Sequence, residues 1–170
     1  GNPPYGIALS QVHKLLFKCI YDDVHTRTPD SFNYFISRSL RLTRTTGVLA
    51  FIVPNVLFYQ NEYEKTRRLL LGKRLLQAIN FGDGVFSSAT VPSCVFVVSN
   101  NPSEKYDFIY SDVRSTSRED WQASDAQCKS ENCLATPGVV FGLVQADIDI
   151  FFKVRDKSVI LDELTSEVAS

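Results

Sequence analysis

The sequence lacks the features that would place it in a membrane or secreted class. Its longest apolar run, GVLAFIVPNVLF, is interrupted by Pro54 and Asn55 and is too short to span a bilayer. The N-terminus has no basic segment followed by an apolar stretch, the pattern of a secretory signal peptide. Methionine is absent even at position 1, so we expect the chain to be a piece of a longer protein. The prediction is a cytoplasmic protein with no membrane partner.

Metal-ligating and redox residues are also scarce. The chain has four cysteines and two histidines. Cys94 lies in the apolar run CVFVV and is predicted to be a core residue. Cys128 and Cys133, in CKSENC, match no common zinc-ligand spacing with His13 and His25, and we expect a surface loop there. The predictions are reduced thiols and no metal site.

What is present is a globular composition with an uneven charge. Hydrophobic residues make up 44% and charged residues 22% of the chain, which predicts one packed domain or part of a larger one. Residues 1–100 carry 11 Lys and Arg against 6 Asp and Glu, whereas residues 101–170 carry 7 against 13. The basic first part suits a polyanionic partner such as nucleic acid. The candidates for phosphate contact, unless they form a solvated helix face, are Lys65, Arg67, Arg68, Lys73 and Arg74.

The spacing of apolar residues predicts alternating helices and strands. Residues 47–55 form a continuous apolar run closed by a proline, which is typical of a strand buried on both faces. Ser31 is predicted to cap a helix whose inward side chains are Phe32, Phe35, Ile36 and Leu40. The predicted helices are 8–22, 31–43 and 61–75, and the predicted strands are 47–55, 76–83, 93–100 and 106–111. This order predicts an α/β fold around a largely parallel sheet.

The tetrapeptide Asn2-Pro3-Pro4-Tyr5 is a stiff segment at the start of the chain. Its two prolines fix two successive φ angles and remove two N–H donors. It matches the (Asn/Asp)-Pro-Pro-(Tyr/Phe) motif of amino-group methyltransferases. Residues 31–55 and 79–99 resemble the segments that follow this motif in adenine-N6 DNA methyltransferases of the gamma class, including single-chain restriction–modification enzymes. The resemblance covers most of residues 1–100.

The resemblance implies the C-terminal half of a Rossmann-like, S-adenosylmethionine-dependent methyltransferase fold with a mixed, mostly parallel sheet. It implies double-stranded DNA with a flipped adenine as substrate. The side-chain carbonyl of Asn2 and the backbone carbonyl of Pro3 would accept the N–H bonds of the adenine amine, while Pro4 helps to hold them still. Tyr5 and Phe86 would stack on the base. Asn55 follows a strand, where α/β sheets place ligands, and is a further substrate-binding candidate.

Most of the S-adenosylmethionine site is expected outside this chain. The family's glycine-rich turn and acidic residue precede the proline motif, and Gly82 and Gly84 come too late in order to replace them. Residues 1–100 are therefore interpreted as half of a catalytic domain. Residues 101–170 would be its last strand and a connector toward a target-recognition domain. We expect such a piece to be inactive alone and to dimerise or aggregate through an exposed sheet edge, which light scattering would test.

Two other functions stay open at this point. One keeps the reaction and changes the acceptor to adenine in RNA or to a protein glutamine. The other is a non-catalytic DNA-binding or assembly module with the same fold.

Overall fold

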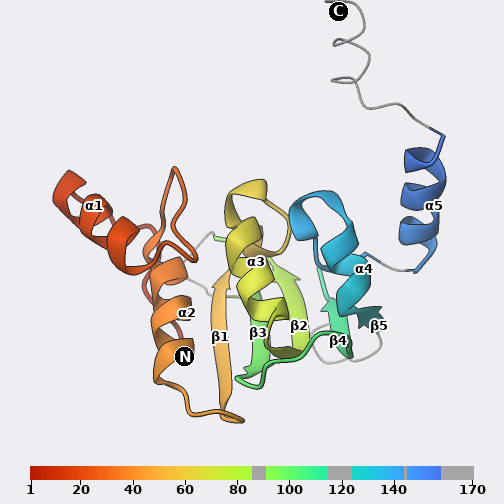
Figure 1. Cartoon of the computed structure of the whole chain (residues 1–170), viewed down its shortest axis with the longest axis horizontal. Coiled ribbons are helices and arrows are strands. Elements are labelled where there is room, and N and C mark those ends of the chain that lie inside the picture. Colours follow the sequence, from red (N-terminus) through yellow and green to blue (C-terminus); the bar gives the residue numbers. More distant parts are fainter. Residues whose placement is uncertain (86–90, 115–123, 144, 158–170) are drawn as a thin grey trace, which may run out of the picture.

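The computed structural model describes residues 1–85, 91–114, 124–143 and 145–157 (Figure 1). The helices are α1 (Gln11–Ile20), α2 (Ser31–Leu42), α3 (Glu64–Leu71), α4 (Ser130–Ala135) and α5 (Gln145–Arg155). The strands are β1 (Val48–Pro54), β2 (Arg74–Gly82), β3 (Ser93–Ser99), β4 (Asp107–Asp112) and β5 (Asp125–Lys129). Short 3-10 turns follow β1 (η1, Asn55–Phe58), precede α3 (η2, Asn61–Tyr63) and follow α4 (η4, Pro137–Val139). The predicted α/β class is confirmed.

The five strands form one mixed sheet in the order β1-β3-β2-β4-β5. Only β2 and β4 pair in parallel, and the other three neighbouring pairs are antiparallel. The expectation of a mostly parallel sheet is therefore wrong. The reason is β3, which follows β2 along the chain, runs antiparallel to both β1 and β2 and inserts between them. β1 and β2 still run in the same direction, because η1, η2 and α3 form the crossover between them.

The outer edge of β1 positions the start of the chain. The Gly1 nitrogen donates to Ala50 O at 2.6 Å, and Ile52 N donates to Gly1 O at 3.0 Å. This pattern places Gly1 beside Phe51 as a parallel neighbour of β1. A Cβ atom on Gly1 would lie 2.8 Å from Cε1 of Phe51, so the close approach requires glycine. The segment that follows Gly1 therefore runs toward the carboxyl end of β1.

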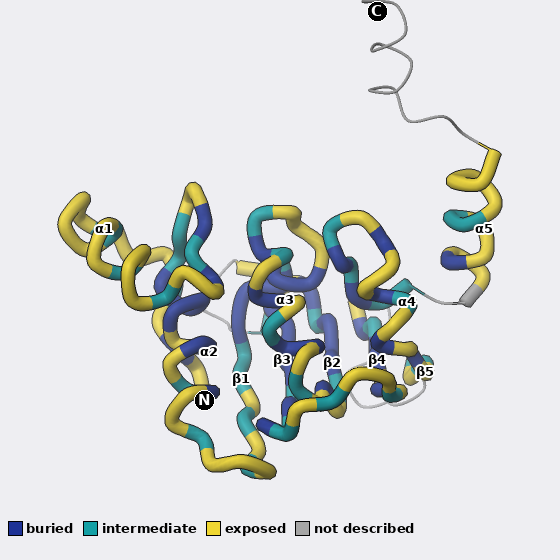
Figure 2. Tube along the Cα trace, viewed as in Figure 1, coloured by how far each residue is buried: buried dark blue, intermediate teal, exposed yellow. Residues whose placement is uncertain are grey.

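The core lies between the helices and the central strands of the sheet. These strands are the most buried part of the molecule (Figure 2). Phe32, Ile36 and Leu40 of α2 are buried as predicted, whereas Phe35 is 45% exposed. β1 alternates between exposed and half-buried residues and is fully buried only at Val53 and Pro54. It is not buried on both faces as expected, since Val48 is 61% exposed and Ala50 is exposed as well.

One further prediction about burial is wrong. Cys128 lies in β5 and Cys133 in α4, and both are buried rather than in a surface loop. The helix spacing in 8–22 is confirmed by α1, but none of its residues is buried. Its apolar face is formed by Val12, Leu15, Leu16 and Ile20. Among the helices that the structure describes, none is long and apolar enough to cross a membrane.

Candidate active site

The Asn-Pro-Pro-Tyr motif is anchored from the beginning of α2. Ser31 Oγ donates to the Pro4 carbonyl oxygen at 2.6 Å. Gly6 N donates to both carboxylate oxygens of Asp30, at 3.0 and 3.1 Å, and Gly6 adopts a φ of +70° that favours glycine. Ser31 was expected to cap α2, but Asp30 occupies the cap position and its side chain makes no cap hydrogen bond. Both side chains hold the motif instead.

The anchoring leaves the two proposed acceptors of the motif without partners. Pro3 is buried, Asn2 is exposed, and Tyr5 is half-buried against the core. Across the described ranges of the chain, neither the Asn2 carboxamide nor the Pro3 carbonyl makes a hydrogen bond. The contacts at Gly1, Pro4 and Gly6 therefore fix the backbone on both sides of two open hydrogen-bonding groups.

Asn55 lies at the same edge of the sheet, immediately after β1. It is buried, with 4% of its surface exposed, and its Nδ2 donates to Asn80 Oδ1 at 3.1 Å. Tyr59 Oη donates to Asn55 Oδ1 at 3.3 Å, and Asn55 N donates to Pro92 O at 2.9 Å. The structure thus brings Asn55 to the edge where the motif ends, but as part of an internal hydrogen-bond network.

Asn80 is a site residue that the sequence reasoning missed. Besides Asn55, its Oδ1 accepts from Gly82 N at 3.3 Å, which satisfies an amide at the irregularity where β2 leaves its register with β3. Gly82 has a φ of +66° and begins the connection to β3. A polar Asn inside the apolar stretch 75–82 was the available signal. Phe86, the second predicted stacking residue, lies outside the described residues.

Arg67 corrects the expectation of a basic phosphate-binding face on α3. It is fully buried, so it cannot contact a DNA phosphate. Its guanidinium donates to Leu57 O at 2.5 Å, to Gln60 O at 2.7 Å and to Gly138 O at 2.6 and 3.0 Å. Burial lowers the pKa of Arg67 to about 10, so the group stays charged at neutral pH. Arg67 therefore ties the turns after β1 to η4.

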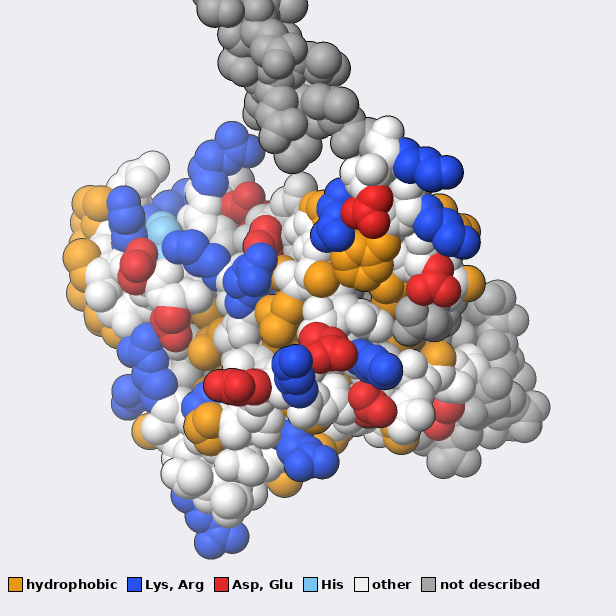
Figure 3. Space-filling view, turned by 45° about the vertical axis from the view of Figure 1, so that its right-hand side comes forward, with side chains coloured by type: hydrophobic (Ala, Val, Ile, Leu, Met, Phe, Trp, Pro, Cys, Tyr) orange, Lys and Arg blue, Asp and Glu red, His pale blue; other side chains and the backbone are white. Residues whose placement is uncertain are grey.

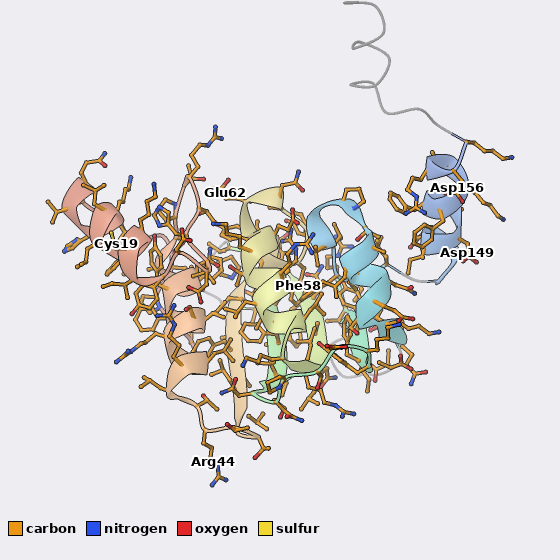
Figure 4. All side chains as sticks on the ribbon, in the orientation of Figure 1. Cys19, Arg44, Phe58, Glu62, Asp149 and Asp156 are labelled. Atoms are coloured by element: carbon orange, nitrogen blue, oxygen red, sulfur yellow. The ribbon has the colours of Figure 1, made fainter. Side chains whose placement is uncertain are left out.

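On one face of the described molecule, the basic side chains do not form a patch of one sign. Lys, Arg, Asp and Glu side chains alternate on the face shown in Figure 3. An open hollow of about 540 Å³ between the loop 21–30 and the start of α3 is lined by His25, Arg27 and Lys65 but also by Glu62. Glu62, labelled beside the upper end of α3 in Figure 4, accepts from Thr28 N at 2.7 Å and so holds that loop. This hollow does not include the motif.

The described residues offer no cluster of metal ligands. They contain no group of three His, Cys, Asp or Glu side chains able to hold a metal ion. Gly82 and Gly84 belong to the connection after β2, and the space beside Gly82 is filled by Arg114, 2.8 Å from where a Cβ would lie. Gly82 therefore does not fit the cradle of a methyl donor.

The comparisons place the chain among the methylases of restriction–modification systems. The Eco57I restriction-modification methylase family matches residues 1–86, and the chain belongs to that family. The chain is similar in fold to a protein of Listeria monocytogenes that is described as a class I S-adenosylmethionine-dependent methyltransferase. Its TM-score is 0.54 at 15% identity, over 72% of this chain and 38% of that one.

Two curated relatives are large restriction–modification proteins. A protein of Methanocaldococcus jannaschii, described as a type II restriction enzyme and methyltransferase, is 32% identical over 112 residues. The Eco57I type II restriction enzyme and methyltransferase of Escherichia coli is 27% identical over 116 residues. Each match covers 64% of this chain, which spans only 9% and 11% of the two relatives.

Proposed function

We propose that this chain is the C-terminal half of the catalytic domain of a DNA methyltransferase in a restriction–modification system. The reaction is methyl transfer to N6 of an adenine flipped out of double-stranded DNA. The observation that carries the proposal is the motif itself, which is fixed at Gly1, Pro4 and Gly6 and leaves the Asn2 carboxamide and the Pro3 carbonyl open. Family membership of residues 1–86 supports a methyltransferase role.

The two open groups suit the chemistry of an exocyclic amine. The lone pair of adenine N6 is conjugated with the ring, so the amine is a poor nucleophile. The Asn2 side-chain oxygen and the Pro3 backbone oxygen each accept one N–H bond, which draws the nitrogen toward a pyramidal geometry and localises the lone pair. Because Pro3 and Pro4 restrict the backbone, little reorganisation is needed when the methyl group moves. S-adenosylmethionine supplies the methyl group, and its site lies mostly outside this chain.

The flipped base needs flat surfaces to replace its lost stacking. Tyr5 is half-buried against the core, which holds its ring in place beside the motif. We propose that Tyr5 stacks on one face of the adenine and Phe86 on the other, at about 1–3 kcal/mol per stacked base. Asn55 supports this edge of the sheet through its side-chain bond to Asn80. Its backbone N also donates to Pro92 O, just before β3, and so anchors the end of the connection that carries Phe86.

The division of the chain follows from the same proposal. Residues 1–100 form the catalytic half, and residues 101–170 add the last strands and a connector toward a target-recognition domain. In support, β4 pairs with β2 and β5 pairs with β4, so the same sheet continues beyond residue 100.

The product of the full-length protein that carries this chain tests the proposal. The full-length protein is incubated with tritiated S-adenosylmethionine in three parallel reactions, which contain unmethylated genomic DNA, total RNA or a protein extract. Each product is then digested to its monomers. Label in N6-methyldeoxyadenosine is the expected result. Label in RNA adenine or in protein glutamine would move the function to another acceptor. A protein that binds DNA but transfers no label to any acceptor would be a non-catalytic module.

A further inference from the structure

A second group of polar side chains lies at the carboxyl edge of the sheet, on strands remote from the motif. Asp112 ends β4 and is in register with Asn80 of β2, and Val113 N donates to Asn80 O at 2.9 Å. Arg114 follows directly, so its side chain starts at the same edge as the Asn55–Asn80 pair. It is close enough to Tyr59 for an electrostatic interaction.

Asp112 holds the guanidinium of Arg114 from one side only. Arg114 Nε donates to the two carboxylate oxygens at 2.9 and 3.1 Å, and Nη2 donates to Oδ2 at 2.6 Å. A guanidinium has five N–H bonds, and this contact uses those on Nε and one on Nη2. Within the part of the chain that the structure describes, Nη1 has no hydrogen-bond partner. The end of the guanidinium therefore presents a second, unused pair of parallel donors.

The stem of the side chain is fixed as well. Arg114 Cγ lies 2.8 Å from the position of a Cβ on Gly82, so the arginine stem crosses the space that this glycine leaves open. Arg114 N also donates to Asp112 Oδ1 at 3.2 Å. The side chain is nevertheless 58% exposed. Much of the entropy cost of ordering a long side chain is thus already met before a ligand arrives.

We propose that Arg114 binds a backbone phosphate of the DNA duplex that flanks the target adenine, an inference that rests on the proposed DNA methyltransferase function. Two parallel N–H donors match two oxygens of a phosphodiester. Three strands, β1, β3 and β2, separate the Gly1 segment from β4. At about 4.8 Å per spacing, Arg114 is roughly 19 Å from the motif, beyond reach of the flipped base. This distance corresponds to about six base pairs of B-DNA.

The paired carboxylate shapes the test. The Arg114→Ala variant would leave Asp112 unpaired, and that negative charge would repel DNA whether or not Arg114 binds phosphate. The double variant Asp112→Asn with Arg114→Gln avoids this, because it removes the fork without changing the net charge. A matched control is Asp23→Asn with Arg41→Gln. That ion pair joins at 2.9 Å with side-chain exposures of 34% and 45%, against 34% and 58% for Asp112 and Arg114.

The experiment measures the Kd for DNA of the full-length protein against salt concentration, with one duplex that contains the methylation site and one that does not. The proposal predicts that the slope of log K against log salt weakens by about 0.9 in the Asp112/Arg114 variant, equally on both duplexes. The Asp23/Arg41 variant keeps the wild-type slope. Thermal unfolding of each variant checks that it is folded.

Three results would overturn the inference. An unchanged slope in the Asp112/Arg114 variant excludes a phosphate contact. A loss confined to the site-containing duplex assigns the fork to a base edge instead. An equal loss in the control variant shows that the effect is not specific to Arg114. If the wild-type protein neither binds nor methylates DNA, the proposed function itself fails, which is a distinguishable outcome.

Discussion

Replacing Arg67 by methionine is predicted to destabilise the fold far more than the same change at the neighbouring Arg68. Arg67 is fully buried and is hydrogen-bonded to the carbonyl oxygens of Leu57, Gln60 and Gly138. Arg68 is half-exposed and pairs with Glu64 one turn earlier in α3. The two positions are adjacent, so the comparison holds helix propensity and side-chain length constant.

The magnitude follows from the carbonyl groups that Arg67 leaves behind. Methionine fills much of the volume but donates no hydrogen bond, so the carbonyl oxygens of Leu57 and Gly138 lose their partner, whereas Gln60 O keeps its bond from Tyr63 N at 3.0 Å. A buried acceptor without a partner costs about 1–3 kcal/mol. Removal of a desolvated charge offsets part of that loss. We therefore expect Arg67→Met to lower the free energy of unfolding by about 3 kcal/mol. An exposed i,i+4 ion pair contributes about 0.3–0.5 kcal/mol, which is the expected cost of Arg68→Met.

Urea denaturation of the 170-residue chain, followed by far-UV circular dichroism, measures both values. Arg67→Lys is a useful third variant, because a single ammonium keeps the charge but lacks the planar fork that reaches three carbonyls, and its cost should be intermediate. A loss below about 1 kcal/mol for Arg67→Met, or equal losses at the two positions, would refute the assigned role of Arg67.

Two further predictions concern groups whose titration the fold controls. Cys19 is exposed, while burial raises the pKa of the other three thiols. One thiol of the native chain should therefore react rapidly with Ellman's reagent, and all four should react in urea. A Cys19→Ser variant that keeps the rapid phase would contradict this. Burial also raises to about 12 the pKa of three tyrosines, Tyr63, Tyr106 and Tyr110. Their contribution to stability is full below the unfolded pKa of about 10 and is lost as pH rises through about 12. Absorbance at 295 nm should show them un-ionised at pH 11 until urea is added; full ionisation of the folded chain at that pH would contradict the burial of these rings.

The positions of the strands could be predicted from the sequence, but their pairing could not. Short segments rich in apolar residues located β1, β2, β3 and β4. The insertion of β3 between β1 and β2 depends on which edge a returning strand joins, and no local pattern contains that information. The region around β5 was read as a loop because its pattern is polar, although Cys128 faces the core.

The same limit applies to the candidate site. The motif was recognisable because two prolines between an amide and an aromatic ring are an unusual local signal. Its supports were not, since Ser31 and Asp30 are ordinary helix-capping residues, and only the tertiary structure directs them to Pro4 and Gly6. Arg67 was misread for a similar reason. A charged residue on a helix is usually solvated, and its burial depends on carbonyl groups distant in the sequence.

The most direct test of the central claim is the rate of methyl transfer in a single turnover for wild-type, Asn2→Ala and Asn2→Asp versions of the full-length protein, with the Kd for DNA measured in parallel. Aspartate keeps an acceptor oxygen at the same place, and alanine removes it. The account predicts a loss of about 100-fold in rate for Asn2→Ala, a much smaller loss for Asn2→Asp, and little change in DNA affinity for either. An Asn2→Ala protein that transfers the methyl group at the wild-type rate would contradict the role assigned to the motif.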